Sequence, residues 1–530
     1  MAARKRRHDA YGLAVTLLAA SGCMIGPDYA RPPAPTAGRW IEAEHAALRT
    51  ESADTPRWWE VFGDPVLGRL VAIAHAENLT LRAAGLRVLQ AQARRGVAIG
   101  GLFPQTQQLS GSYTRTRLSL NNQPVLDRDL DSFQAGFDAA WEIDLWGRFR
   151  RAIEAADAEL LAAVADYDDM LVSLVAEVAT TYVQIRVLDE RIALARANVG
   201  VQRDSLEIAT VRFEAGGTSE LDVQQARTLL ADTEASIPQL EIQRRQAEDS
   251  LCVLLGVPPG DLADLLGTSS GIPAAPVAIA VGIPANLLRR RPDVERAERQ
   301  VAAQSARIGV AKADLLPRFQ LIGSVGLSAE DAANFFEGHS FESFGGPRFD
   351  WPILNYGRIT NAIRVEDATF QELAATYANT VLRAQQEVED AVAGYLRGAE
   401  QVAHLIRGVA AANRAVDLSL IQYREGAADY TTVLTSQQSK LREDDSLTTS
   451  RGSVTLSAIA LYKALGGGWE LRDGADFVPK DVQQEMRART GWGGMLDSEA
   501  QADDVKAAGA GTEGDTRPGF LRWRRWWPTW

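Results

Sequence analysis

The stretch WEIDLWGR at Trp141–Arg148 returns 210 residues later as WPILNYGR at Trp351–Arg358. Other pairs keep this offset, namely Glu177-Val178 with Glu387-Val388, Gly216 with Gly426, and Leu255-Gly256 with Leu465-Gly466. Upstream, Val97-Ala98 and Pro104 match Val310-Ala311 and Pro317 at an offset of 213. One offset held over such a long stretch indicates internal duplication. The chain is therefore predicted to contain two copies of a unit of about 210 residues.

Each copy contains a proline-free stretch of 68 residues, at Arg148–Ala215 and at Arg358–Glu425. Both stretches are rich in Ala, Leu, Glu, Gln and Arg, which are strong helix formers. Apolar residues recur at helical spacing, as in Leu160, Leu161, Val164, Leu171, Leu174, Val175 and Val178. At 1.5 Å per residue, each helix would be about 100 Å long.

Each long helix is followed by a polar, glycine-containing turn. The first turn contains Gly216 and Gly217, and the second contains Gly426. Glycine is the usual residue just past a helix end. Helical patterns then resume at 221–255 and 430–465. Two long antiparallel helical hairpins are therefore predicted, over about 148–256 and 358–466.

Before each long helix the hydrophobic period changes to two, over about 105–141 and 317–353. This alternation is typical of transmembrane β-strands of about 10 residues. Two strands per repeat give four per chain. Four strands cannot close a barrel, and an open edge in lipid leaves backbone groups unsatisfied, so the chain must oligomerise. Two chains would supply eight strands and three would supply twelve, and this arithmetic leaves both possibilities open.

The N-terminus has the pattern of a secretory signal. Arg4-Lys5-Arg6-Arg7 precede an apolar run from Tyr11 to Ala20, which is too short to span a membrane. The following Ser21-Gly22-Cys23 resembles the cleavage box of bacterial lipoproteins. This resemblance implies removal of residues 1–22 and acylation of Cys23, and Met24 after the cysteine implies sorting to outer-membrane lipid. Residues 23–64 are expected to form the anchor and an extended segment.

Composition narrows the function. The formal net charge of -13 argues against nucleic-acid binding. The histidines are scattered without the spacing of metal ligands, so no metal or cofactor is predicted. The pattern G-x-S-x-G at 267–271 lies in a linker and lacks the strand and helix that a nucleophile elbow needs. No catalytic constellation is found, and the chain is predicted not to be an enzyme.

Five motifs in the same order resemble the TolC-like outer-membrane efflux factors, in particular their lipoprotein (NodT/OprM-type) branch. They are Trp58-Trp59 with Asp64-Pro65, Trp141–Arg148, Ala215-Gly216 with Leu221-Asp222-Val223, Arg290-Arg291-Pro292-Asp293, and Ala464–Trp469. The resemblance implies an α+β membrane protein that assembles as a homotrimer, with a 12-stranded β-barrel in the outer membrane and a 12-helix periplasmic α-barrel. It also implies a periplasmic adaptor and an inner-membrane transporter of the resistance–nodulation–division (RND) class as partners.

In such channels the helical turns close the periplasmic tip, and acidic side chains there favour cations. The family usually carries aspartates in the return helix of the second repeat, where this chain has Thr432 and Thr435. Nearby Asp429 is expected to replace them, while Glu220 and Asp222 supply acids in the first repeat. Before the second turn, Tyr423, Arg424 and Glu425 are candidate latch residues between helices.

The sequence thus predicts repeats at 65–270 and 271–470 and a flexible extension at 471–530. The expected function is passive export of small molecules across the periplasm and outer membrane. An exit duct for type I protein secretion, or a periplasmic structural lipoprotein without a pore, remain as alternatives. The extension ends in an Arg/Trp-rich tail, a composition that binds membranes or other polymers, although a disordered tail is the simpler interpretation.

Overall fold

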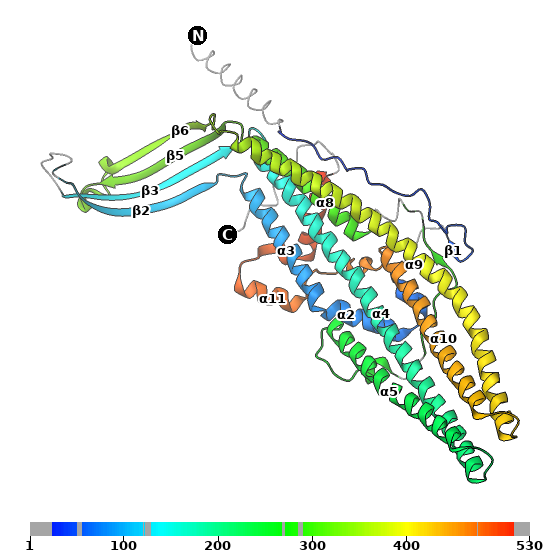
Figure 1. Ribbon diagram of the computed structural model, residues 1–530. Helices are drawn as coiled ribbons and strands as arrows, with labels where there is room; N and C mark the ends of the chain where they lie inside the picture. The colour runs from blue at the N-terminus through cyan, green and yellow to red at the C-terminus, as the bar shows by residue number, and fades with distance from the viewer. Residues whose placement is uncertain are drawn as a thin grey trace.

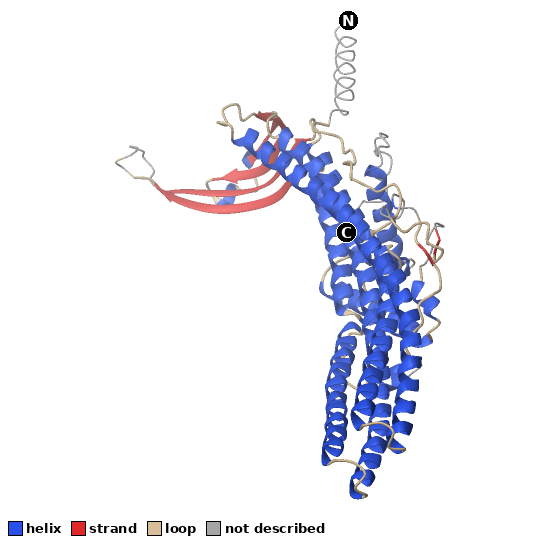
Figure 2. Ribbon diagram, turned by 45° about the vertical axis from the view of Figure 1, so that its right-hand side comes forward, coloured by secondary structure: helices blue, strands red, loops and turns tan. Residues whose placement is uncertain are grey.

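The molecule is long and narrow. A computed structural model of the chain describes residues 24–49, 56–119, 121, 129–267, 271–282, 284, 290–473 and 475–512. The long strands lie together at one end, and the two hairpin turns lie at the other (Figures 1 and 2). The predicted Cys23 site and the Arg/Trp-rich tail fall outside the described residues.

From α3 in the first repeat and α8 in the second, the described elements of the two repeats match in the same order. The first contains α2 (Pro65–Glu77), α3 (Leu79–Gly100), β2 (Thr106–Arg117), β3 (Asp129–Ile143), α4 (Arg148–Glu214) and α5 (Glu220–Leu254). The second contains α8 (Pro292–Ala313), β5 (Arg318–Ala329), β6 (Phe341–Asp350), α9 (Arg358–Arg424) and α10 (Tyr430–Ala464). Shorter elements are β1 (Leu48–Arg49), η2 (Trp58–Phe62), α6 (Ala263–Leu266), β4 (Ile279–Ala280), η3 (Ala332–Asn334) and η4 (Gly338–Ser340). The predicted α+β fold, with paired strands and two long hairpins, is confirmed.

Within the described residues, the long strands form one four-stranded antiparallel sheet in the order β2-β3-β5-β6. One face carries apolar rows, such as Leu109, Phe137 and Val325 side by side on β2, β3 and β5. The adjacent row on the other face contains Gln108, Asp138 and Ser324. This division is typical of a barrel wall with lipid on one side and water on the other.

The strand-to-helix junctions of the two repeats have the same geometry. The indole of Trp141 donates a hydrogen bond to the Leu102 carbonyl (3.1 Å), and that of Trp351 donates to the Leu315 carbonyl (3.0 Å). Gly147 and Gly357 precede α4 and α9 with φ of 76° and 80°. This left-handed conformation costs glycine little, so the chain can turn sharply from sheet to helix.

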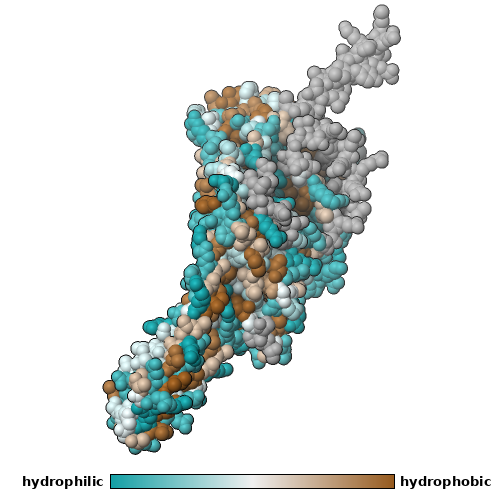
Figure 3. Space-filling view, turned by 90° about the vertical axis from the view of Figure 1, so that its right-hand side faces the viewer, coloured by the Kyte–Doolittle hydropathy of each residue, from teal (hydrophilic) through white to brown (hydrophobic). Residues whose placement is uncertain are grey.

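The long helix α4 lies at the centre of the packing. Near the strands it packs against α3 and α8, and further down against α5 and α10. By length and composition α4 is apolar enough to cross a membrane, yet 61% of its apolar window is buried inside the protein. Its apolar surface therefore serves packing between helices. By contrast, α9 keeps aliphatic side chains exposed along its length, among them Val365, Leu382, Ile406, Leu418 and Ile421. Figure 3 faces this side and shows apolar residues (brown) among hydrophilic ones.

The predicted flexible extension is corrected for residues 471–473 and 475–512, which fold onto the helices as η5 (Trp469–Arg472), α11 (Lys480–Arg489), η6 (Gly493–Leu496) and α12 (Ser498–Thr512). The Arg472 guanidinium binds Asp168 at 2.6 Å, and the Phe477 ring packs edge-on against Tyr167. Burial raises the pKa of Asp168 to about 6, and the Arg472 charge opposes this rise. A few buried contacts are therefore enough to fix this part of the extension against the helices.

Candidate functional site: the helical tip

Both hairpin turns end their long helices with the same backbone motif. In the first turn, the Gly216 and Gly217 amides donate to the Phe213 and Arg212 carbonyls (2.9 and 2.8 Å). In the second turn, the Gly426 and Ala427 amides donate to the Tyr423 and Gln422 carbonyls (3.1 and 2.8 Å). Gly216 and Gly426 have φ of 71° and 76°, as a Schellman cap requires. The predicted turn glycines therefore shape the tip of each hairpin.

A cluster of polar contacts joins the two hairpins at this tip. The Tyr423 hydroxyl at the end of α9 donates to the Asp222 carboxylate at the start of α5 (3.2 Å). The Thr218 hydroxyl donates to the same carboxylate oxygen. From α4, the Arg212 guanidinium stacks 4.5 Å from the Tyr423 ring centroid and donates to the Tyr423 carbonyl. Asp222, Thr218, Arg212 and Tyr423 are called the tip latch below.

An apolar cluster supports the latch. Tyr430, at the start of α10, packs edge-on against Tyr423 with ring centroids 5.3 Å apart, and its hydroxyl lies 3.3 Å from the Ser205 hydroxyl. Both tyrosines are 1% exposed. Burial is the main cause that raises the pKa of each phenol, so both stay protonated at physiological pH and the Tyr423 hydroxyl remains a donor. The buried neighbours are Ala209, Val223, Ala226 and Val433.

The other predicted gate residues lie around the latch and are exposed. Glu220 accepts a hydrogen bond from Gln224 at 3.2 Å, within its own helix. Asp429 is the residue before α10, and its side chain makes no capping hydrogen bond there. The Thr435 hydroxyl bonds the Thr431 carbonyl (2.9 Å) of its own helix. Arg424, Glu425 and Thr432 are exposed at the same end.

The structure therefore brings together two of the predicted residues, Asp222 and Tyr423, and adds residues that were missed. Arg212 and Tyr430 were not predicted. One signal was available, because the repeats differ at these places: Asp222 corresponds to Thr432, and Tyr423 corresponds to Phe213. Such differences between copies mark positions where one hairpin can make a contact that the equivalent positions of the other cannot.

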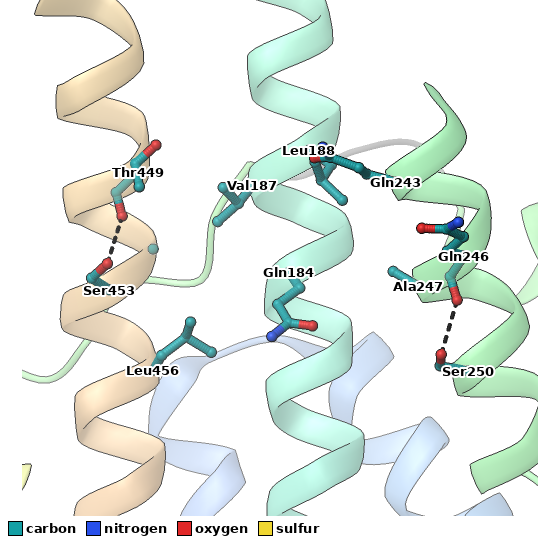
Figure 4. Close-up of a pocket in the computed structure, with 11 residues that line it drawn as sticks. Gln184, Val187, Leu188, Gln243, Gln246, Ala247, Ser250, Thr449, Ser453 and Leu456 are labelled. Carbon is teal, nitrogen blue, oxygen red and sulfur yellow. Dashed lines mark hydrogen bonds between the residues drawn. The ribbon is translucent and has the colours of Figure 1, made fainter. Parts of the chain in front are cut away.

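A separate cavity of about 400 Å³ lies further up, between α4, α5 and α10 (Figure 4). Its lining consists of Gln184, Val187, Leu188, Gln243, Gln246, Ala247, Ser250, Thr449, Gly452, Ser453 and Leu456. None of these side chains is ionisable, so the cavity lacks a group for acid–base catalysis. The Ser250 and Ser453 hydroxyls bond carbonyls of their own helices (2.9 and 3.0 Å). Across the described residues, no group of three or more His, Cys, Asp or Glu side chains could hold a metal ion.

The sequence profile of the outer membrane efflux protein family matches residues 70–257 and 283–467. The chain belongs to this family. It is 33% identical over 429 residues to the pyoverdine export outer membrane protein OpmQ of Pseudomonas putida, covering 80% of this chain and 90% of that protein. It is 31% identical to nodulation protein T of Rhizobium leguminosarum bv. viciae, covering 86% and 93%. The solved outer-membrane channel OprN matches with a TM-score of 0.79 and 33% identity, over 84% of this chain and 100% of that chain.

These findings confirm the predicted family. The chain is an outer-membrane efflux channel, with its strands at the membrane and its helices forming the periplasmic tunnel. The family is one of efflux channels rather than enzymes. The tip farthest from the strands is therefore the periplasmic end of the channel, where the tip latch lies (Figure 1).

Replacing Tyr423 with phenylalanine should loosen the tip latch. The change removes the hydroxyl that bonds the Asp222 carboxylate, a type of hydrogen bond worth about 1.5–3 kcal/mol. We expect Tyr423→Phe to raise single-channel conductance in planar bilayers several-fold over the wild type. Phe213→Leu, at the matching and exposed position of the first repeat, serves as the control. Equal conductance of Tyr423→Phe and wild type would contradict a latch role.

Proposed function

We propose that three copies of the chain form one continuous passive duct, which takes small molecules from an inner-membrane transporter to the cell exterior. The observation that carries this proposal is the open four-stranded sheet at the head of two long hairpins, with β2 and β6 at its edges. Edge strands in lipid leave backbone donors and acceptors without partners. If β6 of one copy pairs with β2 of the next, these backbone donors and acceptors bond to each other.

The duplication supports a specific contact between subunits. Inside one chain, the Trp146 indole donates to the Pro317 carbonyl (2.8 Å), which joins the β3–α4 junction of the first repeat to the α8–β5 junction of the second. The matching residues are Tyr356 and Pro104. In a closed ring, Tyr356 of each copy would face the segment around Pro104 of its neighbour.

The exposure of this region fits that arrangement. Tyr356 is 95% exposed, and the preceding Ile353 and Leu354 are 71% and 79% exposed. Burying side chains of this kind stabilises by about 1.5–3 kcal/mol each. The exposed aliphatic side chains of α9 would be covered by the neighbouring copy in the same way. Three copies would give twelve strands and twelve long helices, the arrangement that the family resemblance implies.

The proposed partners follow from the channel's place in the cell. A channel that crosses the outer membrane has no energy source of its own, so an inner-membrane transporter of the RND class would drive export. A periplasmic adaptor would join that transporter to the helical tip. Opening the tip requires the two hairpins to separate, which breaks the contacts between Arg212, Asp222 and Tyr423. Adaptor binding would supply the free energy for this step. A protein-secretion exit duct is the second candidate, because the same channel geometry could serve a different inner-membrane partner.

We also propose that Cys23 carries the lipid anchor. Its neighbour Met24 lies against Gly147, and the Ile25 amide donates to the Trp146 carbonyl at 3.1 Å. This contact lies at the junction between β3 and α4. An acyl chain attached one residue earlier would therefore start close to the membrane boundary.

Cross-linking tests the subunit contact. We expect the double variant Tyr356→Cys with Pro104→Cys, treated with a short bis-maleimide in membranes, to give covalent dimers and trimers on denaturing gels. The control pairs Pro104→Cys with Val277→Cys, because Val277 is exposed and precedes β4, outside the four-stranded sheet. Cys252 is fully buried and should not react. A cross-linked ladder that exceeds three chains, or no cross-linking, would exclude the proposed ring.

Ion selectivity tests which acids face the pore. The Asp222 carboxylate is engaged by the tip latch, whereas the exposed Asp429 side chain makes no capping bond. We expect Asp429→Asn to lower the cation preference measured by reversal potentials, because three copies would lose a ring of charge. Glu425→Gln, a neighbouring exposed acid, is the matched control. Unchanged selectivity in Asp429→Asn would refute the acidic-ring proposal.

Lipidation is tested by metabolic labelling with palmitate. We expect label in the wild type and none in Cys23→Ser, while Cys252→Ser should label like the wild type. If Cys23→Ser still incorporated palmitate, the assignment of the anchor to this residue would be wrong.

A further inference from the structure

The C-terminal extension continues beyond the part of the chain that resembles its relatives. The family profile ends at residue 467, and OprN is matched over its whole length by 84% of this chain. The described part of the extension ends with α12 at Thr512. The extension lies beside α3, nearer to the strands than to the hairpin turns (Figure 1). Its location and the sequence that follows it point to a second contact with the membrane.

Buried polar contacts hold α12 at a defined height. The Asp504 carboxylate accepts hydrogen bonds from Arg95 (3.2 Å) and from Gln92, both on α3. The Arg95 guanidinium also binds Asp157 of α4 at 2.5 Å. Asp504 and Arg95 are only 4% and 8% exposed. An ion pair buried to this degree is costly to break by removing one partner, so the middle of α12 is a fixed point.

This fixed point is close to the strands. Asp157 is nine residues along α4 from Arg148, the first residue of that helix after β3. At 1.5 Å per residue, the two lie about 14 Å apart along the helix axis. Thr512 is eight residues beyond Asp504 and therefore at most about 12 Å from it along α12. Arg95 bridges Asp157 and Asp504 and adds a few ångströms, so the end of α12 lies within roughly 30 Å of the level at which the strands begin, whichever way α12 points.

The sequence after α12 has an unusual composition. Residues 516–530 read TRPGFLRWRRWWPTW, and they contain four arginines, four tryptophans and no acidic residue. The whole chain, by contrast, has a net charge of -13. Tryptophan concentrates at membrane–water interfaces, and basic residues are drawn to anionic lipid head groups.

We propose that residues 516–530 bind the phospholipid surface of the periplasmic leaflet of the outer membrane, next to the strands of the same subunit. A tail of 18 residues can extend about 60 Å, which exceeds the distance to be covered. A bilayer surface offers an apolar layer for the tryptophan rings and phosphates for the guanidinium groups. The cell-wall polymer offers no apolar layer, and the position of α12 close to the strands favours the bilayer. The fixed α12 keeps the tail at the membrane and limits the entropy lost on binding.

The test uses the full-length protein in vesicles of phosphatidylethanolamine, with or without phosphatidylglycerol. An environment-sensitive fluorophore is attached at Trp527→Cys, and lipids with brominated acyl chains serve as quenchers. We expect the label to shift to the blue and to be quenched, most strongly with phosphatidylglycerol. The matched control places the label at Ala502→Cys on the exposed side of α12, where no quenching is expected.

A charge-reversal variant provides the second arm. Arg522→Glu, Arg524→Glu and Arg525→Glu, combined with the label at 527, should weaken membrane partitioning of the tail roughly a hundredfold. Channel conductance should stay at the wild-type level, which separates a failure of this inference from a failure of the channel. A label at 527 that remains water-exposed in both vesicle types would overturn the inference. So would tail-dependent sedimentation with purified peptidoglycan in place of vesicle binding, because it would identify the cell-wall polymer as the ligand.

Discussion

Backbone groups at the edge of a sheet in lipid must find partners, and the rest of this structure depends on that constraint. The described sheet ends at β2 and β6, so a single chain leaves two edges open. Repeating the sheet around a ring pairs every edge, and the same repetition arranges the long hairpins side by side below it. The exposed junction around Tyr356 and the exposed aliphatic residues of α9 then become interior surfaces. The four-stranded sheet therefore needs neighbouring copies to satisfy its edges in the membrane.

Duplication provides most of this architecture, while the tips of the two hairpins differ in sequence. Trp141 and Trp351 make the same hydrogen bond in both repeats because the same junction is needed twice. At the tip the copies differ, and the Tyr423–Asp222 contact joins unlike positions of the two hairpins. The first repeat has Phe213 where the second has Tyr423, and the second has Thr432 where the first has Asp222, so the equivalent pair of positions lacks both the phenol and the carboxylate. At the tip the two hairpins meet through a few polar contacts over a small apolar cluster, separate from the core around α4.

The sequence was sufficient to predict elements with a long, regular signal. The proline-free stretches from Arg148 and Arg358 predicted the two hairpins, and the period-two segments predicted the strands. Both predictions were possible because helix and strand periodicities repeat over many residues. The sequence could not predict the partners of Asp222, because the contact with Tyr423 depends on how two hairpins pack side by side. Arg212 was missed because a single arginine near a helix end usually faces solvent. The extension was misjudged for a similar reason: Arg472 and Asp504 are ordinary charged residues until Asp168 and Arg95 are placed beside them.

The account rests on three copies closing one barrel through the open edges of their sheets. Electron cryo-microscopy of the full-length protein in lipid nanodiscs tests this most directly. The account predicts a threefold particle in which β6 of each copy pairs with β2 of the next, with Tyr356 against the segment around Pro104 of the neighbour. A particle with another number of subunits, or one whose sheet edges stay unpaired in the lipid, would contradict it.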